Sequence, residues 1–300
     1  MSKQNWTVNN IPDQSGRVVI VTGANSGIGY EAAKVLAEKN AEVILAVRSQ
    51  TKGEIAKSTM LSDAPQAKVE VMLLDLANLK SVSEFSAAFK TKYKSLDILI
   101  NNAGIMIPPY GKTVDGFESQ FGTNHLGHFA LTAQLFELLK ITANSRIVNV
   151  SSTAHNMGNI NFDDLGWESR KYTAWKAYGD SKIANLYFTY ALAQSIKDAG
   201  LDIMVTAAHP GYAATGLQKG IFLKILNTLV AQSGFMGAMP TLMAAIDPEA
   251  KGGNFYGPSG FAQQRGYPKR VFSNKLSHDE NIAQKLWGVS EELTGLKFKV

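Results

Sequence analysis

Short apolar runs alternate with helix-like stretches along the first two thirds of the chain. Apolar runs bounded by glycine or polar residues predict buried strands at 17–22, 42–47, 69–74, 96–100, 146–150 and 202–208. The stretches between them predict helices at 27–39, 51–62, 78–93, 113–140 and 174–198. Buried strands that alternate with helices are typical of a parallel sheet covered on both faces. We therefore expect an α/β fold with a doubly wound parallel sheet.

The domain organisation follows from the continuity of this alternation. No linker, repeat or low-complexity segment interrupts it, which predicts one domain over 16–300 after an N-terminal tail at 1–15. The segment 212–240 is apolar and irregular. Residues at helical spacing within it are Phe222, Ile225, Leu226 and Leu229. This segment fits either a helix packed on the core or a lid over an apolar substrate pocket.

Composition narrows the class of protein. Hydrophobic residues make up 45% of the 300 residues, enough for a substantial core. Lys and Arg exceed Asp and Glu by 30 to 25 without a run of five or more like charges, so we expect no nucleic-acid partner. The chain has no cysteine, which excludes disulfides and thiolate chemistry. The first 16 residues are mostly polar, and no stretch reaches the ~18 apolar residues of a membrane span. We expect a cytoplasmic protein without a membrane span.

The turn after the first strand carries a phosphate-binding pattern. Thr22-Gly-Ala-Asn-Ser-Gly-Ile-Gly29 leads from the strand directly into a helix. Glycines let the backbone approach a pyrophosphate, and the helix N-terminus favours its negative charge. A turn that only caps the helix is the alternative. The residues predicted to bind a dinucleotide here are Gly23, Asn25, Ser26, Gly27, Ile28 and Gly29.

The ends of the next strands indicate which dinucleotide is bound. The second strand ends at Arg48 without an acid, which favours NADP(H) over NAD(H), although Arg48 could also be an ordinary solvated arginine. After the third strand, Asp75 either accepts from an adenine amino group or caps the next helix, with Leu76 beside it. The fourth strand ends in small residues that leave room for the cofactor ribose, and we assign Asn102, Ala103 and Gly104 to the site.

Four residues predict a site of proton transfer. Tyr178 and Lys182 lie one turn apart in a predicted helix, where an ammonium would lower the tyrosine pKa toward neutrality. Such a tyrosine can act as an acid and base at physiological pH. Ser152 follows the fifth strand and can hold a substrate carbonyl beside Tyr178. Asn124 lies inside a predicted helix, where its side chain or a locally opened backbone carbonyl can hold a water near Lys182. Taken singly, Asn124 also fits a buried amide, and Ser152 fits a loop serine.

The order of these motifs resembles the short-chain dehydrogenase/reductase family over about residues 16–300. The matching positions are Thr22–Gly29, Asn101–Gly104, Asn124, Ser152, Tyr178–Lys182 and Pro210-Gly211. The resemblance implies a Rossmann-type sheet of about seven strands, a nicotinamide cofactor and an Asn–Ser–Tyr–Lys tetrad. It also implies that Lys182 bonds the nicotinamide ribose, that Pro210 and Gly211 lie at the cofactor, and that Thr215 contacts its carboxamide.

Two features of the sequence resemble one branch of that family. Ser152 and Tyr178 are 26 positions apart, and the additional segment Asn159–Leu165 resembles the retinol dehydrogenases, the WW-domain oxidoreductases and the protochlorophyllide reductases. The C-terminal 283–295 resembles the retinol dehydrogenase group in particular. Vertebrate members often carry a membrane anchor that this chain lacks, so we expect a soluble carbonyl reductase. The family commonly dimerises through the helices of Asn124 and Tyr178; the insertion at 156–170 would cover that surface, and we expect a monomer.

These features together predict an NADP(H)-dependent oxidoreductase that interconverts an alcohol and a carbonyl of a largely apolar substrate, with Tyr178 as the acid and base. Two alternatives stay open: reduction of an activated C=C bond, and a non-catalytic NADP-binding regulatory protein. The sequence contains no Gly-x-Ser-x-Gly elbow, so we do not expect a hydrolase. His125 and His128 lack a third ligand, and we predict no metal site.

Overall fold

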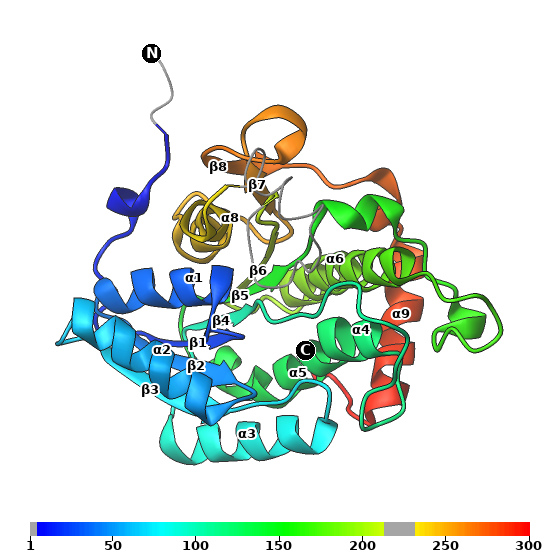
Figure 1. Cartoon of the computed structure of the whole chain (residues 1–300), viewed down its shortest axis with the longest axis horizontal. Helices are drawn as coiled ribbons and strands as arrows, with labels where there is room; N and C mark the ends of the chain where they lie inside the picture. Colours follow the sequence, from blue (N-terminus) through cyan, green and yellow to red (C-terminus); the bar gives the residue numbers. More distant parts are fainter. Residues whose placement is uncertain (1–4, 213–231) are drawn as a thin grey trace.

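The computed structural model describes residues 5–212 and 232–300 of the chain (Figure 1). The predicted cofactor contact Thr215 and most of the predicted lid at 212–240 lie outside the described residues.

Among the described residues, eight strands form one sheet in the order β3-β2-β1-β4-β5-β6-β7-β8. The strands are β1 (Val18–Thr22), β2 (Glu42–Val47), β3 (Lys68–Leu73), β4 (Ile98–Asn101), β5 (Ser145–Val150), β6 (Ile203–Ala208), β7 (Phe255–Pro258) and β8 (Pro268–Val271). Neighbouring strands are parallel except for β7 and β8, which are antiparallel. The predicted doubly wound α/β sheet is confirmed, with one strand more than the expected seven.

The order of the strands positions the site. The chain runs outward from β1 through β2 to β3 and then crosses back to β4 on the other side of β1. In doubly wound sheets, a crevice opens beyond the carboxyl ends of the strands where the order reverses. The ends of β1 and β4 are therefore where a ligand is expected to bind.

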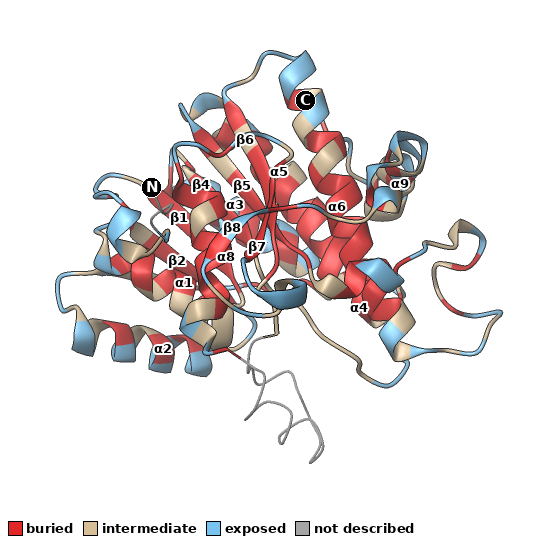
Figure 2. Ribbon diagram, turned by 90° about the horizontal axis from the view of Figure 1, so that it is seen from above, coloured by how far each residue is buried: buried red, intermediate tan, exposed pale blue. Residues whose placement is uncertain are grey.

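Helices cover both faces of the sheet (Figures 1 and 2). One face carries α1 (Gly27–Glu38), α2 (Gln50–Asp63) and α8 (Gly234–Ile246), and the other carries α3 (Leu79–Lys92), α5 (Gly127–Ile141) and α6 (Ala174–Asp198). Side chains alternate between the faces along a strand. Val19 and Val21 belong to the core under α1, whereas Val18 and Ile20 belong to the core under α3.

The helix predicted at 113–140 begins later and contains an irregular turn. It consists of α4 (Ser119–Phe121), a π-helical turn (Gly122–Leu126) and α5. It starts at Ser119 because the Glu118 carboxylate accepts hydrogen bonds from the amides of Gln120 and Phe121, at 3.0 and 2.7 Å. The π turn changes the backbone spacing at Asn124, where the sequence allowed a local opening.

Two segments differ from their predicted roles. Residues 234–240 are the start of α8, and Ala238 and Met239 are buried in the core beside α1, so the prediction of a lid is wrong for them. Their apolar pattern reflects burial in that core. In the predicted tail, Ile11 is buried in the same core, and the Gln14 amide donates to the Lys39 carbonyl at 2.7 Å. The described residues of the tail therefore pack on the domain.

The C-terminal helix α9 (Glu280–Thr294) packs along α6 (Figure 1). Its Trp287 lies with Phe298 against Phe129 of α5 and Phe188 of α6, with ring centroids 4.9 to 6.1 Å apart. In the ranges 5–212 and 232–300, no helix combines the length and apolar character needed to cross a bilayer.

Candidate active site

Three glycines shape the turn between β1 and α1 and the start of α1. Gly23 (φ 69°) and Gly27 (φ 59°) adopt left-handed backbone conformations that favour glycine. A Cβ on Gly29 would collide with the Asn102 side-chain amide and lie 2.7 Å from the Gly23 carbonyl oxygen. Ser26 precedes α1 without a side-chain bond to its first turn, so the first amides of this helix have no side-chain cap. Such amides suit an anionic group.

The end of β4 is fixed against the end of β1. The Thr22 hydroxyl accepts from the amides of Asn102 and Ala103, both at 2.9 Å, and the Asn102 side chain donates to the Thr22 carbonyl at 2.9 Å. Because Thr22 is fully buried, these bonds hold the two strand ends in one geometry. The predicted cofactor residues of the two motifs therefore lie side by side.

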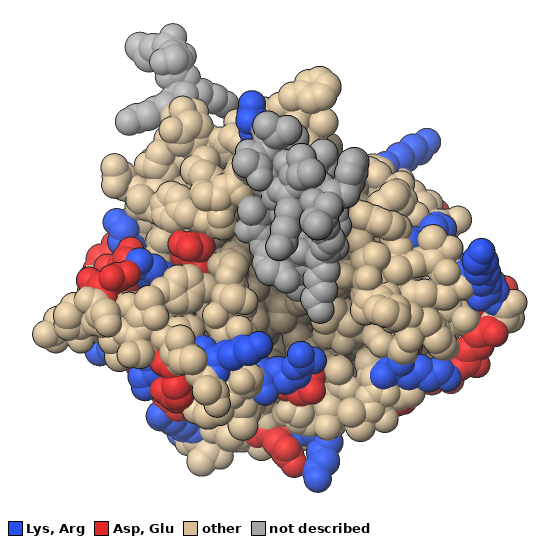
Figure 3. Space-filling model, in the orientation of Figure 1, with Lys and Arg blue, Asp and Glu red and all other residues tan. Residues whose placement is uncertain are grey.

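Two positively charged side chains, Arg48 and Lys52, lie just after the end of β2. Arg48 is exposed and lines the cavity described below, and it makes no ion pair or hydrogen bond within the described part of the chain. Lys52, in the first turn of α2, lines the same cavity. Figure 3 shows Lys and Arg side chains beside the hollow on this face. The position offers two positive charges and no acid to a phosphate group.

Asp75 hydrogen-bonds the backbone of the turn after β3 and also lines the cavity. Its Oδ1 accepts from the Ala77 amide at 3.0 Å, and its own amide donates to the Ser81 hydroxyl at 3.0 Å. Asp75 and Leu76 both line the cavity. Capping and cofactor contact are thus compatible at Asp75, because only one carboxylate oxygen is used by the turn.

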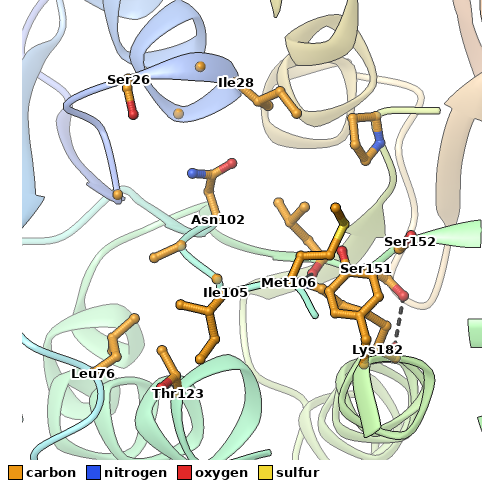
Figure 4. A pocket seen from close by; sticks show the side chains of 18 of the residues that line it. Ser26, Ile28, Leu76, Asn102, Ile105, Met106, Thr123, Ser151, Ser152 and Lys182 are labelled. Atoms are coloured by element: carbon orange, nitrogen blue, oxygen red, sulfur yellow. Dashed lines mark hydrogen bonds between the residues drawn. The ribbon is translucent and has the colours of Figure 1, made fainter. Parts of the chain in front are cut away.

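Ser152, Tyr178 and Lys182 all line the cavity. Figure 4 shows Ser152 and Lys182 on the same side of it, away from Ser26. Lys182 Nζ donates to the Val150 carbonyl at 3.1 Å and lies 5.7 Å from the ring centroid of Tyr178. The Ser151 hydroxyl donates to the Lys182 carbonyl at 2.8 Å, which fastens α6 to the end of β5. Ser152 Oγ accepts from the Ala154 amide at 3.1 Å. Its hydroxyl proton is therefore available for another acceptor.

Burial dominates the ionisation of the Tyr178–Lys182 pair. It raises the pKa of Tyr178 to about 12, with the Ser152 hydrogen bond acting in the opposite direction. It lowers the pKa of Lys182 to about 8. The lowering of the tyrosine pKa expected from Lys182 is not found among the protein groups. The reason is that loss of solvation disfavours both charged forms at this depth.

Asn124 lies directly behind the cavity. Its Oδ1 accepts from the Ile105 amide at 2.9 Å, and its Nδ2 donates to the Ile105 carbonyl at 3.0 Å and to Ser181 Oγ at 2.9 Å. The Asn124 carbonyl accepts from His128 Nδ1 at 3.0 Å. Both amide protons are thus used by the protein. The side chain fastens the loop after β4 to α6, next to Lys182.

The predicted residues enclose one cavity of about 920 Å³. Those that line it are Gly23, Asn25, Ser26, Gly27, Ile28, Gly29, Arg48, Asp75, Leu76, Asn102, Ala103, Gly104, Ser152, Tyr178, Lys182, Pro210 and Gly211. Of the predicted site residues, only Asn124 and Thr215 are missing from this lining, and Thr215 lies outside the described residues. A Cβ on Gly104 would stand 3.0 Å from Asn124 Oδ1, so one residue separates Asn124 from the cavity.

The wall near Tyr178 is largely apolar. It contains Ile105, Met106, Met157, Trp175 and Tyr212, none of which was predicted as a site residue. Met157 is 45% exposed and Trp175 is 49% exposed, so large apolar side chains face solvent at the rim. No local motif marks these residues, since the fold alone brings them to the cavity.

His125 of the π turn and His128 in the first turn of α5 bond different partners. His125 Nε2 lies 2.9 Å from Ser290 Oγ of α9, whereas His128 Nε2 lies 2.9 Å from Thr22 Oγ1. No group of three His, Asp or Glu side chains in the described parts of the chain converges to hold a metal ion.

The chain is similar to known proteins over most of its length. Residues 17–225 match the family described as short chain dehydrogenase. The chain is 40% identical over 290 residues to retinol dehydrogenase 12 of Mus musculus, covering 95% of this chain and 88% of that protein. It is 40% identical over 294 residues to retinol dehydrogenase 13 of Homo sapiens, covering 94% and 86%. A crystal structure of an uncharacterised protein from Mycobacterium paratuberculosis has a TM-score of 0.85 and 42% identity, covering 99% of this chain and 100% of that one.

Proposed function

The chain belongs to the short-chain dehydrogenase family of oxidoreductases, and we propose that it is an NADP(H)-dependent enzyme that interconverts an alcohol and a carbonyl of a largely apolar substrate. Members of this family bind a nicotinamide cofactor and catalyse oxidation and reduction. The preference for NADP(H), the substrate class and the role of each residue are the proposal. We also propose a cytoplasmic location.

One observation carries the proposal. Tyr178, Ser152 and Lys182 line the same cavity as the glycine turn of Gly23 to Gly29. The turn fits a pyrophosphate, because a side chain at Gly29 would fill the approach and because the first amides of α1 have no side-chain cap. A dinucleotide held there would extend along the strand ends toward Tyr178.

The residues near Tyr178 then have distinct tasks. When bound, the nicotinamide supplies hydride chemistry at the substrate carbon. Tyr178 donates its proton to the carbonyl oxygen, and the Ser152 hydroxyl positions that oxygen. Burial keeps Tyr178 protonated at neutral pH, which is the form that reduction requires. Lys182, whose Nζ lies 5.7 Å from the Tyr178 ring centroid, would hold the nicotinamide ribose and tune Tyr178 once the cofactor is bound. Proton transfer of this kind contributes about 10²–10⁴-fold.

Asn124 supports this arrangement from behind. Its amide holds Ile105 and Ser181, so it sets the distance between the loop after β4 and the helix that carries Tyr178. The water relay through Asn124 stays a prediction.

Arg48 and Lys52 support the choice of NADP(H). A guanidinium and an ammonium at the end of β2 match a ribose 2′-phosphate, whereas NAD(H) binding at this point commonly uses an acid. The names of the similar retinol dehydrogenases point to an alcohol as substrate. The wall of Met106, Met157 and Trp175 supports an apolar body for it.

The test is Tyr178→Phe, assayed by NADPH oxidation with a panel of apolar aldehydes, ketones and enones. We expect turnover to fall by about 10²-fold or more while NADPH binding changes little. Tyr110→Phe is the matched control, because Tyr110 is 44% exposed and is not among the residues that line the cavity. Near-normal turnover of Tyr178→Phe would contradict the proposal.

The same panel separates the two alternatives. Turnover of enones without turnover of aldehydes or ketones would indicate reduction of a C=C bond. NADPH binding without oxidation on any substrate would indicate a regulatory protein. The intact group of Ser152, Tyr178 and Lys182 that lines the cavity favours the enzyme.

A further inference from the structure

The β7–β8 hairpin and its flanks form the most one-sidedly charged part of the chain. Residues 251–278 contain no Asp or Glu. They contain five cations, namely Lys251, Arg265, Lys269, Arg270 and Lys275, and all five are exposed. Elsewhere the chain mixes both signs, since the totals are 30 Lys and Arg against 25 Asp and Glu. None of the five has an ion-pair partner among the residues that the structure describes.

The same hairpin exposes large aromatic side chains. Phe261 is 95% exposed, Phe272 is 76% exposed and Tyr267 is 41% exposed. Arg270 and Phe272 are two residues apart at the edge of the sheet, and the Arg270 guanidinium lies 5.4 Å from the Phe272 ring centroid. Figure 2 shows this end of the hairpin as exposed ribbon. We call Phe261, Arg265, Tyr267, Lys269, Arg270 and Phe272 the hairpin surface.

The turn that carries Phe261 is held in an uncommon backbone conformation. Ala262 (φ 48°) and Gln263 (φ 58°) are both left-handed, a conformation that is strained for residues other than glycine. Gln263 Oε1 is held by His209 Nε2 at 2.8 Å, and the Gln264 carbonyl accepts from the Tyr212 amide at 2.8 Å. The surrounding structure thus fixes a turn that projects a phenylalanine into solvent.

We propose that the hairpin surface docks the protein on an anionic lipid bilayer. Aromatic rings partition into the headgroup region of a membrane, while adjacent Lys and Arg side chains are attracted to anionic lipids. The combination of three exposed aromatics, unpaired cations and no acid has the complementary charge and apolar area for such a surface. Docking is peripheral, because the hairpin only touches the headgroup layer.

A second copy of the chain fits this surface less well. β8 is the edge strand of the sheet and exposes unpaired backbone groups, which two copies could pair. Pairing would bring Lys269 and Arg270 against the same cations of the partner. Like charges opposite one another destabilise paired strands, and no acid in 251–278 relieves the repulsion.

Docking would place the cavity close to the bilayer. The hairpin turn contacts Tyr212 through Gln264, and Tyr212 lines the cavity. An apolar substrate that partitions into lipid would then enter beside Met157 and Trp175 without crossing bulk water. This consequence rests on the proposed function, whereas docking itself does not.

The experiment is flotation of the full-length protein with vesicles of phosphatidylcholine alone or with added phosphatidylserine. We expect binding to the anionic vesicles, weakened by salt and absent on neutral ones. Lys269→Glu with Arg270→Glu should lower the partition coefficient about tenfold or more, and Phe261→Ser with Phe272→Ser should also lower it clearly. Lys68→Glu with Lys94→Glu and Val114→Ser with Ile141→Ser are matched controls, since these residues are exposed elsewhere.

Several outcomes would overturn the proposal: absence of vesicle binding, equal losses in the control variants, a dimer that only the hairpin variants abolish, or tighter binding to an oligonucleotide than to anionic vesicles. Turnover of a small water-soluble aldehyde is measured in parallel. Hairpin variants should leave this turnover unchanged. If the unmodified protein does not turn over the aldehyde, the proposed function is contradicted. The docking proposal is decided separately, by the vesicle experiment.

Discussion

His128 Nε2 lies 2.9 Å from Thr22 Oγ1, and this contact joins the π turn of Asn124 to the predicted cofactor site. Burial lowers the pKa of His128 to about 4, so the ring is neutral and carries one proton. Nδ1 lies 3.0 Å from the Asn124 carbonyl, which can only accept, so that nitrogen carries the proton. Nε2 is then the nearer of two acceptors for the Thr22 hydroxyl, the other being the Ile100 carbonyl at 3.3 Å. The Thr22 oxygen in turn accepts from the Asn102 and Ala103 amides. One buried chain of hydrogen bonds therefore spans three segments of the site.

We expect His128→Leu to raise the KM for NADPH about tenfold and to lower kcat. The Thr22 hydroxyl would lose this acceptor and the Asn124 carbonyl would lose its donor, so the strand ends and the π turn would no longer be held together. An unsatisfied buried group also costs about 1–3 kcal/mol of stability. Steady-state kinetics with varied NADPH, together with urea denaturation, measure the two effects.

His125→Leu is the control for this prediction. His125 is buried in the π turn, three residues before His128, but it bonds Ser290 of α9 and not Thr22. We expect this variant to lose stability while its KM for NADPH stays close to that of the unmodified protein. Equal increases in KM for both variants would show that His128 acts only through the stability of the helix.

The parts of the site that were predictable are those with a local cause. The glycine turn is predictable because Gly23 and Gly27 need left-handed backbone and Gly29 needs space. Tyr178 and Lys182 were predictable because helical spacing places them on one face, and the structure has both on α6. Their roles stay predictions, because spacing does not fix the surrounding polarity that sets their pKa values.

The parts that were not predictable depend on packing between distant segments. Lys52 carries no motif and reaches the cavity only because α2 follows Arg48 along the sheet edge. β8 was not placed because Pro268–Val271 shows no alternation longer than four residues. The apolar start of α8 fits either a lid or a helix packed on the core, since sequence alone does not distinguish an apolar core helix from a cover.

Arg48→Ala should raise the Kd for NADPH about ten- to a hundred-fold and leave the Kd for NADH almost unchanged. A charge-assisted hydrogen bond of this kind contributes about 1.5–3 kcal/mol. Lys52→Ala should have a smaller effect of the same kind, since its single ammonium makes no bidentate contact. Because both side chains are exposed, added salt should reduce the preference for NADPH.

Titration calorimetry or fluorescence measures these constants. Lys57→Ala is the control, because Lys57 lies on α2 but is not among the residues that line the cavity. If Arg48→Ala weakens both cofactors equally, Arg48 serves the fold or the adenine face. Tighter binding of NADH than of NADPH by the unmodified protein would contradict the cofactor preference itself.

The protein should lose stability as the pH falls from about 6.5 to 4. Burial lowers the pKa of both His128 and His209 to about 4, and that of His125 to about 3, from the ordinary value of 6.5. Between these values the unfolded chain binds more protons than the folded chain, so the free energy of unfolding falls with falling pH. Each histidine contributes up to about 1.4 kcal/mol per pH unit in this window. Urea denaturation at pH 7, 6 and 5 measures the slope. A constant free energy of unfolding over this range would contradict the assignment of neutral buried histidines.

The described C-terminal residues bear on the oligomeric state. The insertion at 156–170 packs on α6 and α9, where Ile160, Phe162 and Leu165 lie against the buried cluster that contains Tyr187. Tyr110 also donates to the Gly166 carbonyl at 3.1 Å. The helices α5 and α6 are covered by α9 and by the tail that carries Phe298. We therefore propose a monomer, because α9 and the C-terminal tail cover these helices in addition to the insertion.

Trp287→Ala combined with Phe298→Ala tests this explanation. Removing these rings opens the aromatic cluster around Phe129, and a buried Phe→Ala change alone costs about 3–5 kcal/mol. We expect the unmodified protein to be monomeric at low micromolar concentration and the double variant to be less stable and to self-associate through the exposed face. Lys299→Ala, exposed beside Phe298, is the control and should leave both properties unchanged. Light scattering that shows a stable dimer of the unmodified protein would contradict the proposal, because α9 would then leave enough of the two helices accessible for a partner.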